Sequence, residues 1–330
     1  MSNTPYGKVC IYGAGAIGAW MGVRLARAGC QVSVVARGAT LSALQQDGLR
    51  CQIDKELLSA PVRASANPAE LGMQDLVILA VKAPSLPEVA RQIAPLLGPS
   101  TVVLTAMNGV PWWFFQGFGE KFAGTQLKAI DPKGEIARAI PAAHIVGGVV
   151  HASCSIREPG YAQHHFGNRL IVGEPSAQKT ERVQQLVQLL SQAGFETELS
   201  AQIQKDIWYK LWGNMTVNPV SALTGATTDK ILGDKLVRDF ISKVMLEAKE
   251  IGARIGIPIF QQPEDRHAVT MKLGAFKTSM LQDVEAGRPV EIDALVTVVQ
   301  ELGTLTGVAT PYTDVLLGLA RLQARTRGLL

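Results

Sequence analysis

The sequence has few cysteines, and they are scattered. They form no CxxC motif and no paired spacing, which excludes a disulfide framework and a cysteine-based zinc site. Histidine is also scarce: His164-His165 is an isolated pair and His151 has no partners at ligand spacing, so we expect no metal site. Reduced thiols, as in the cytoplasm, are expected at Cys10, Cys30, Cys51 and Cys154.

Long runs of apolar or basic residues are absent as well. No stretch of about 18 uncharged apolar residues predicts a membrane span, and the short polar segment 1–8 is unlike a secretory signal. The 32 Lys and Arg exceed the 28 Asp and Glu by only four, without a basic patch. We therefore expect a cytoplasmic protein with no membrane or nucleic-acid partner, whose mild positive charge suits a small anionic ligand.

Apolar residues, by contrast, are plentiful. They make up 47% of the 330 residues, which is enough for a sizeable core and excludes a mostly disordered chain. The length suggests about two domains. Because the residue pattern changes near residue 200, we expect domains over 1–201 and 202–330.

The first of these segments alternates short apolar runs with helical patterns, which predicts right-handed βαβ units and a parallel sheet. Helices are expected over 16–28, ended by Gly29, and over 180–193. Strands are expected over 8–12, 31–36, 75–81, 101–105, 144–150, 162–166 and 169–172, with turns at 158–160 and 167–168. From about residue 206 the pattern is almost entirely helical, with breaks near Pro219, Gly225, Pro258, 287–289 and Pro311.

A GxGxxG motif follows the first expected strand and opens the first helix. Gly13 permits a tight turn, Gly15 lets a pyrophosphate approach the backbone, and Gly18 allows close packing of helix and strand. The free N–H groups and the positive end of the helix dipole favour phosphate binding. The alternative is a glycine turn without a ligand. The residues expected to bind the cofactor here are Gly13, Ala14, Gly15, Ala16, Ile17 and Gly18.

The end of the second strand indicates which dinucleotide binds. An NAD enzyme usually places an acid there, but this chain has Arg37, 19 residues after Gly18, and no acid between 31 and 44. A guanidinium suits a 2′-phosphate, so we predict NADP(H), although a solvated loop arginine is the alternative. Lys82 and Asn108 follow two further strands at the edge where ligands bind, or are ordinary loop residues.

The stretch 206–219 carries the clearest sign of chemistry in the second half. Lys210, Asn214 and Asn218 are four residues apart and share one helical face, beside the apolar positions Trp208, Leu211, Trp212 and Met215. A lysine buried among such neighbours has a lowered pKa and can donate a proton. A solvated polar stripe on an amphipathic helix is the other interpretation.

Ser279 and Glu291 lie near the ends of two helices that a Gly-Arg-Pro turn separates. Side chains at such ends can point into a cleft, but they also serve as helix caps. The residues themselves leave both roles open.

Several of these segments together resemble the ketopantoate reductase (2-dehydropantoate 2-reductase) family. They occur in the family's order over nearly the whole chain: GAGAIG, Arg37, VKAP at 81–84, MNGV at 107–110, WYKLWGNMTVNP at 208–219, SMLQD at 279–283 and EID at 291–293.

The resemblance implies an α/β, Rossmann-type NADP-binding domain and an all-helical C-terminal domain like that of 6-phosphogluconate dehydrogenase. It implies NADPH-dependent reduction of 2-dehydropantoate, a small 2-oxo acid, to (R)-pantoate in pantothenate biosynthesis. Lys210 matches the catalytic proton donor and Glu291 the acid that orients it or contacts substrate. The polar residues around the substrate match Asn108, Asn214, Asn218 and Ser279; the cofactor contacts match Arg37, Lys82 and Asn108.

One segment departs from the compact members of the family, which are shorter. The insertion 111–139 begins with Pro-Trp-Trp-Phe-Phe, which is either core packing or a wall beside the nicotinamide. In the second case the substrate is another 2-oxo or 3-oxo acid. A third hypothesis is an NADP(H)-binding sensor without turnover. Apolar positions in the helical half either form a homodimer interface or belong to the core: Leu295, Val298, Val299, Leu302 and 315–322.

Overall fold

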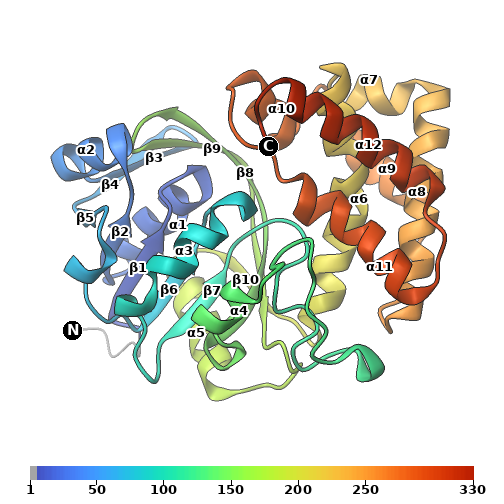
Figure 1. Cartoon of the computed structure of the whole chain (residues 1–330). Helices are drawn as coiled ribbons and strands as arrows, with labels where there is room; N and C mark the ends of the chain where they lie inside the picture. The colour runs from blue at the N-terminus through green and yellow to red at the C-terminus, as the bar shows by residue number, and fades with distance from the viewer. Residues whose placement is uncertain (1–5) are drawn as a thin grey trace. The chain divides into compact units, whose positions relative to one another are not determined.

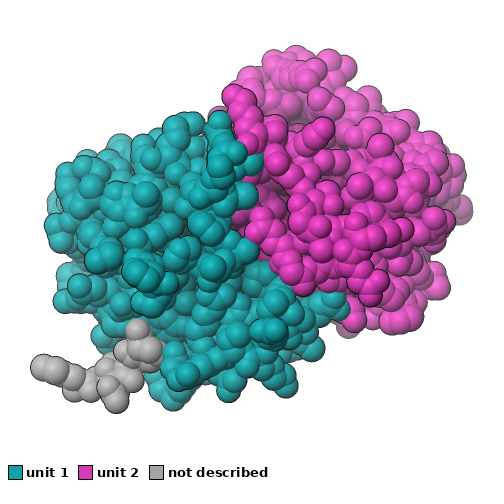
Figure 2. Space-filling model, turned by 60° about the horizontal axis from the view of Figure 1, so that its bottom comes forward, with its two compact units in different colours: residues 1–107, 134–203 teal, residues 108–133, 204–330 magenta. Residues whose placement is uncertain are grey.

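The computed structural model of the chain describes residues 6–330, which form two compact units (Figures 1 and 2). Unit 1 is the chain up to Met107 together with Gly134–Ile203, and unit 2 is Asn108–Lys133 together with Gln204–Leu330. The sequence-based division at 201/202 differs from this in assigning residues 108–133 to the first domain. They group with the helical unit because their aromatic side chains pack on its first helix.

Unit 1 contains a ten-stranded sheet, in the order β4-β3-β9-β8-β7-β6-β1-β2-β5 with β10 beside β9. The strands are β1 Lys8–Tyr12, β2 Gln31–Val35, β3 Leu49–Ile53, β4 Glu56–Ala60, β5 Arg63–Ser65, β6 Leu76–Leu79, β7 Val102–Thr105, β8 Ile145–Glu158, β9 Tyr161–Gly173 and β10 Glu196–Leu199.

The predicted parallel βαβ arrangement is confirmed from β5 through β2, β1, β6 and β7 to β8, where every neighbouring pair is parallel. Each residue of β6 and β7 is buried, as expected of parallel strands covered on both faces. Beyond β8 the sheet becomes mixed, since β8–β9 and β3–β4 pair antiparallel. Sequence patterning did not predict β3, β4, β5 or β10.

The hairpin of β8 and β9 corrects one expectation. The turn at 158–160 is present, but the turn predicted at Gly167-Asn168 is instead an irregularity inside β9, where the register shifts opposite Ala152. Gly167 has a φ of 79°, and a Cβ there would lie 2.5 Å from the carbonyl oxygen of His151. Glycine therefore makes a bulge in a continuous strand rather than a break.

The helices of unit 1 flank this sheet (Figure 1). They are α1 Ala16–Arg27, α2 Gly38–Asp47, α3 Leu86–Gln92, α4 Glu135–Ala139 and α5 Glu181–Gln192, with 3₁₀ turns η1 Pro68–Glu70, η2 Ala83–Ser85, η3 Ala94–Leu96 and η5 Ala142–His144. The predicted helices are confirmed as α1 and α5. Gly29, at a φ of 97°, donates to the Ala26 carbonyl just past α1, and the Thr180 hydroxyl caps α5.

Unit 2 is helical, apart from its loops, as predicted. Its helices are η4 Glu120–Phe122, α6 Ile203–Thr224, α7 Thr228–Gly233, α8 Lys235–Arg254, α9 Pro263–Met271, α10 Ser279–Glu285, the π-helical η6 Asp293–Thr297, α11 Val298–Thr306 and α12 Pro311–Thr326. None of the helices in the described residues is long and apolar enough to cross a membrane.

The helix break predicted at Pro219 is wrong, because α6 continues through that residue to Thr224. Proline removes one backbone hydrogen bond and costs about 3 kcal/mol inside a helix. The neighbouring side chains of Val217, Val220 and Ala222 are buried, so packing on both sides of the proline holds the helix together.

The aromatic segment that opens the insertion is core. The side chains of Trp112 to Phe115 are at most 3% exposed, and the Phe114 ring lies 6.4 Å from that of Trp208 on α6. The Glu301 carboxylate on α11 accepts hydrogen bonds from the backbone N–H groups of Lys128 and Ala129, which fixes a later part of the insertion. This burial supports the packing interpretation rather than a wall beside the nicotinamide.

Candidate active site

The glycine turn between β1 and α1 has the three properties expected of its sequence. Gly13 has a φ of 98°, and a Cβ at Gly18 would lie 2.0 Å from the Gly13 carbonyl oxygen. At Gly15, in contrast, a Cβ would meet no atom within 4 Å. Two glycines are therefore required by packing, whereas the third leaves open space at the N-terminus of α1. No side chain of residues 6–330 caps that terminus, so its N–H groups are available to a phosphate.

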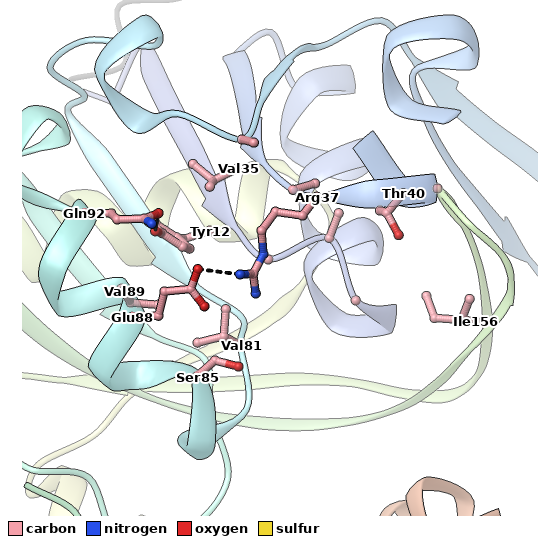
Figure 3. Close-up of a pocket in the computed structure, with 16 residues that line it drawn as sticks. Tyr12, Val35, Arg37, Thr40, Val81, Ser85, Glu88, Val89, Gln92 and Ile156 are labelled. Carbon is pink, nitrogen blue, oxygen red and sulfur yellow. Dashed lines mark hydrogen bonds and ion pairs between the residues drawn. The ribbon is translucent and has the colours of Figure 1, made fainter. Parts of the chain in front are cut away.

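A pocket of about 370 Å³ adjoins this turn in unit 1 (Figure 3). Of the predicted cofactor residues, Gly13, Ala14, Gly15 and Arg37 line it. Ala16, Ile17, Gly18, Lys82 and Asn108 do not line it. Lys82 follows β6 by three residues and precedes η2. The remaining polar lining side chains were not predicted from the sequence: Tyr12, Thr40, Ser85, Glu88 and Gln92.

Arg37 enters this pocket between β2 and α2, and the Glu88 carboxylate on α3 accepts a hydrogen bond from its Nη1 atom (Figure 3). The Arg37 side chain is 65% exposed, so the ion pair contributes little to stability. An arginine on one wall and open space at the glycine turn suit a dinucleotide that carries an extra phosphate. Binding of that phosphate would then require the Arg37–Glu88 ion pair to break, or Arg37 to contact both groups.

In unit 2, Lys210 on α6 meets residues from two distant segments. Its Nζ atom donates a hydrogen bond to Oδ1 of Asn108, 2.7 Å away, and the carboxylate of the buried Glu291 acts on its charge. The predicted catalytic pair and one predicted substrate residue are therefore brought together. The shared face of Lys210, Asn214 and Asn218 is confirmed, because one unbroken helix carries all three.

The contact between Asn108 and Lys210 depends on how the neighbouring loop docks. The Val110 N–H donates to the carbonyl oxygen of Ala294 in the π-helical turn η6, 3.0 Å away. A Cβ at Gly109 would lie 2.5 Å from the same oxygen, so only glycine permits this approach. Since η6 begins two residues after Glu291, the same docking brings the Asn108 loop and Glu291 to Lys210.

Loss of hydration lowers the pKa of Lys210 from 10.5 to about 8, and this is the largest effect on that group. The carboxylate of Glu291 raises the pKa, and the nearby guanidinium of Arg266 lowers it. An ammonium group with a pKa of about 8 releases its proton more readily than an ordinary surface lysine.

The other predicted substrate residues have unused hydrogen-bonding capacity. Within residues 6–330, the side chains of Asn214, Asn218 and Ser279 form no hydrogen bond with another residue. The cap of α10 is the Thr278 hydroxyl, which accepts from the Leu281 N–H, so capping does not occupy Ser279. These polar groups are free to bind a ligand.

Arg266 was not predicted from the sequence; it lies on α9, with its guanidinium carbon 5.7 Å from the centre of the Tyr209 ring. No motif marks it, because its relation to Lys210 arises only when the Arg266 side chain of α9 reaches Tyr209 and Gly213 on α6. Elsewhere in the described residues, no group of three or more His, Cys, Asp or Glu side chains could hold a metal ion.

Comparison with known proteins identifies the family. The family model "Ketopantoate reductase PanE/ApbA" matches residues 9–177, and "Ketopantoate reductase PanE/ApbA C terminal" matches residues 202–324. The chain belongs to the ketopantoate reductase family. It is thus an oxidoreductase of a pyridine-nucleotide family with a Rossmann-type domain and a helical C-terminal domain, as the resemblance predicted.

Relatives match over almost their full length. The chain is 47% identical to 2-dehydropantoate 2-reductase from Mesorhizobium japonicum, with 97% of this chain and 99% of that protein covered. A candidate ketopantoate reductase from Ralstonia solanacearum MolK2 has a solved structure with a TM-score of 0.94 and 55% identity, covering 98% of this chain and 100% of that one. D-mandelate dehydrogenase, at 22% identity, has a TM-score of 0.83 over 98% of this chain and 100% of its own, which shows a shared fold.

Proposed function

We propose that this ketopantoate reductase family member reduces 2-dehydropantoate to (R)-pantoate with NADPH, with Lys210 as the proton donor. The observation that carries the proposal is a partly buried lysine with a lowered pKa, held between an amide and a carboxylate. The 47% identity to a 2-dehydropantoate 2-reductase supports the substrate. The same likeness supports a role in pantothenate biosynthesis and a cytoplasmic location.

The residues of unit 2 supply the position and the charge that the reaction needs. Reduction of a ketone develops negative charge on its oxygen, which the Lys210 ammonium stabilises before it donates the proton. Asn108 and Glu291 hold that ammonium in place, and Asn214, Asn218 and Ser279 offer hydrogen bonds to the rest of a small polar acid. The nicotinamide supplies the hydride when it is bound.

The lowered pKa predicts a specific pH dependence. Lys210 donates a proton only in its ammonium form, and its pKa lies at about 8 rather than 10.5. The value of kcat/KM for ketone reduction should therefore be flat below about pH 7 and fall tenfold per unit well above pH 8. A profile that stays flat to pH 10 would show that a lysine with this pKa does not control the rate.

Arg37 and the open space at Gly15 support NADPH as the cofactor, because a guanidinium pairs with a 2′-phosphate. Arg37→Gln should lower kcat/KM for NADPH about 10- to 100-fold, with little change for NADH. The measurement is a pair of cofactor titrations at saturating substrate. Arg91→Gln is the matched control, because Arg91 is an exposed arginine on α3, the helix that carries Glu88. An unchanged preference for NADPH over NADH in Arg37→Gln would contradict the role of Arg37 in binding the 2′-phosphate.

The proposed activity is tested by following NADPH oxidation with 2-dehydropantoate and a panel of other 2-oxo acids. Turnover of 2-dehydropantoate above the rest supports the proposal. A preference for another acid would favour the second candidate, a reductase for a different 2-oxo acid, which the shared fold of D-mandelate dehydrogenase makes reasonable. Tight NADPH binding without turnover would favour the sensor.

A homodimer is also proposed, on narrower grounds than sequence suggested. Leu295, Val298, Val299 and Leu302 are core residues, at most 2% exposed, and cannot form an interface. Val315, Leu319 and Leu322 are exposed on α12, and a ketopantoate reductase from Staphylococcus aureus is dimeric. Sedimentation of wild type and Leu319→Lys tests this.

A further inference from the structure

The guanidinium of Arg266 lies against α6 one turn from Lys210. A Cβ at Gly213 would be 2.7 Å from its Nε atom and 2.8 Å from Nη2, so the absence of a side chain at Gly213 makes room for it. Since Gly213 is three residues after Lys210, the two positions are neighbours on the surface of the helix. Arg266 also contributes to the lowered pKa of Lys210, which places the two cations within electrostatic range.

Among the described residues, no carboxylate compensates the charge of Arg266. Within residues 6–330 it forms no ion pair, and its Nε atom is buried without a hydrogen-bond partner. Burial of a charge costs free energy unless a counter-charge is present, and the effect is visible as a lowered pKa of Arg266 itself. The ring of Tyr209 offers only a cation–π contact at 5.7 Å.

An uncompensated cation beside a proton donor suits an anionic substrate. In a 2-oxo acid the carboxylate is bonded directly to the ketone carbon, so a ketone oxygen at Lys210 brings the carboxylate within a few ångströms. Arginine binds carboxylates through two parallel N–H groups, which fixes orientation as well as charge. Lys210 already has Asn108 and Glu291 as neighbours, whereas Arg266 forms no ion pair with any residue of 6–330.

We propose that Arg266, seated on Gly213, binds the substrate carboxylate and thereby selects acids that carry the carboxylate next to the ketone. This inference rests on the proposed function and adds a specificity-determining residue to it. Arg266 positions the ketone at Lys210 and makes ketones without an adjacent carboxylate poor substrates.

The test compares the preferred 2-oxo acid of the panel with its neutral methyl ester. In Arg266→Met, kcat/KM for the acid should fall about 10- to 100-fold, mainly through KM, while the ester is unchanged or improved. Arg254→Met is the matched control, because Arg254 is exposed on α8 and paired with Glu250. An equal loss for acid and ester, or an unchanged KM for the acid, would overturn the proposal.

Two further variants guard against misfolding of Arg266→Met. Arg266→Lys keeps a cation and should recover part of the acid preference. Gly213→Ala favours the helix but displaces the guanidinium of Arg266. It should therefore raise the KM for the 2-oxo acid while the melting temperature stays unchanged. If Gly213→Ala folds normally and keeps the wild-type KM for the acid, the position of the Arg266 guanidinium against Gly213 has no role and the proposal fails.

Binding of oxamate, an unreactive 2-oxo acid analogue, separates this inference from the proposed reaction. Calorimetry with NADPH present should give a Kd at least tenfold weaker in Arg266→Met than in wild type. That result supports the carboxylate site even if no acid of the panel is reduced. Equal affinities, or no binding to wild type, would overturn the inference although turnover of 2-dehydropantoate were observed.

Discussion

Lys210→Ala is expected to lower kcat for ketone reduction by about 10²- to 10⁴-fold while NADPH still binds. In the proposed reaction, the variant removes both the ammonium that stabilises charge on the ketone oxygen and the proton that this oxygen receives. Its contact with Asn108 and its lowered pKa are the reasons to expect so large a loss. The measurement is kcat at saturating substrate, with NADPH affinity from fluorescence titration.

Lys205→Met provides the matched control, since Lys205 is exposed on the same helix α6. It should leave kcat within about twofold of wild type. Ethylamine added to Lys210→Ala should restore part of the activity, because a small amine can occupy the space of the lost side chain and donate a proton. A variant with normal kcat would contradict the role of Lys210 as proton donor. A loss of kcat that amines do not rescue would indicate a structural role of Lys210.

The second large effect is expected at the glycine turn. There, substitution of Gly18 by alanine should affect stability, and substitution of Gly15 by alanine should affect NADPH binding. A methyl group at Gly18 would lie 2.0 Å from a backbone oxygen that cannot move without opening the turn. Gly18→Ala should therefore lower the free energy of unfolding by about 3 kcal/mol, measured by urea denaturation.

Gly15→Ala is the partner experiment, because its Cβ meets nothing within 4 Å and its φ of −69° suits any residue. Its free energy of unfolding should stay within about 0.5 kcal/mol of wild type. Its KM for NADPH should rise about tenfold or more, since the methyl group occupies the space where a pyrophosphate approaches. Stable protein with unchanged NADPH affinity would place the phosphates elsewhere.

Local patterns predicted much of the fold. The β1–α1–β2 unit, the buried strands β6 and β7 and the helical second half follow from periodicity and from glycines at positive φ, which depend on a few adjacent residues. The prediction failed where long-range packing decides the local conformation. Pro219 stays inside α6, and Gly167 forms a bulge rather than a turn, because neighbouring elements hold the backbone there.

The sequence by itself determined the glycine turn at the N-terminus of α1 and the row of Lys210, Asn214 and Asn218 on one helical face, since steric limits and helix geometry act within a few residues. Only the tertiary structure decided which groups surround Lys210. Asn108 is 102 residues away, and Arg266 reaches the site from another helix. Such contacts depend on packing between segments distant in sequence, so no local pattern encodes them. The same holds for the grouping of residues 108–133 with the helices.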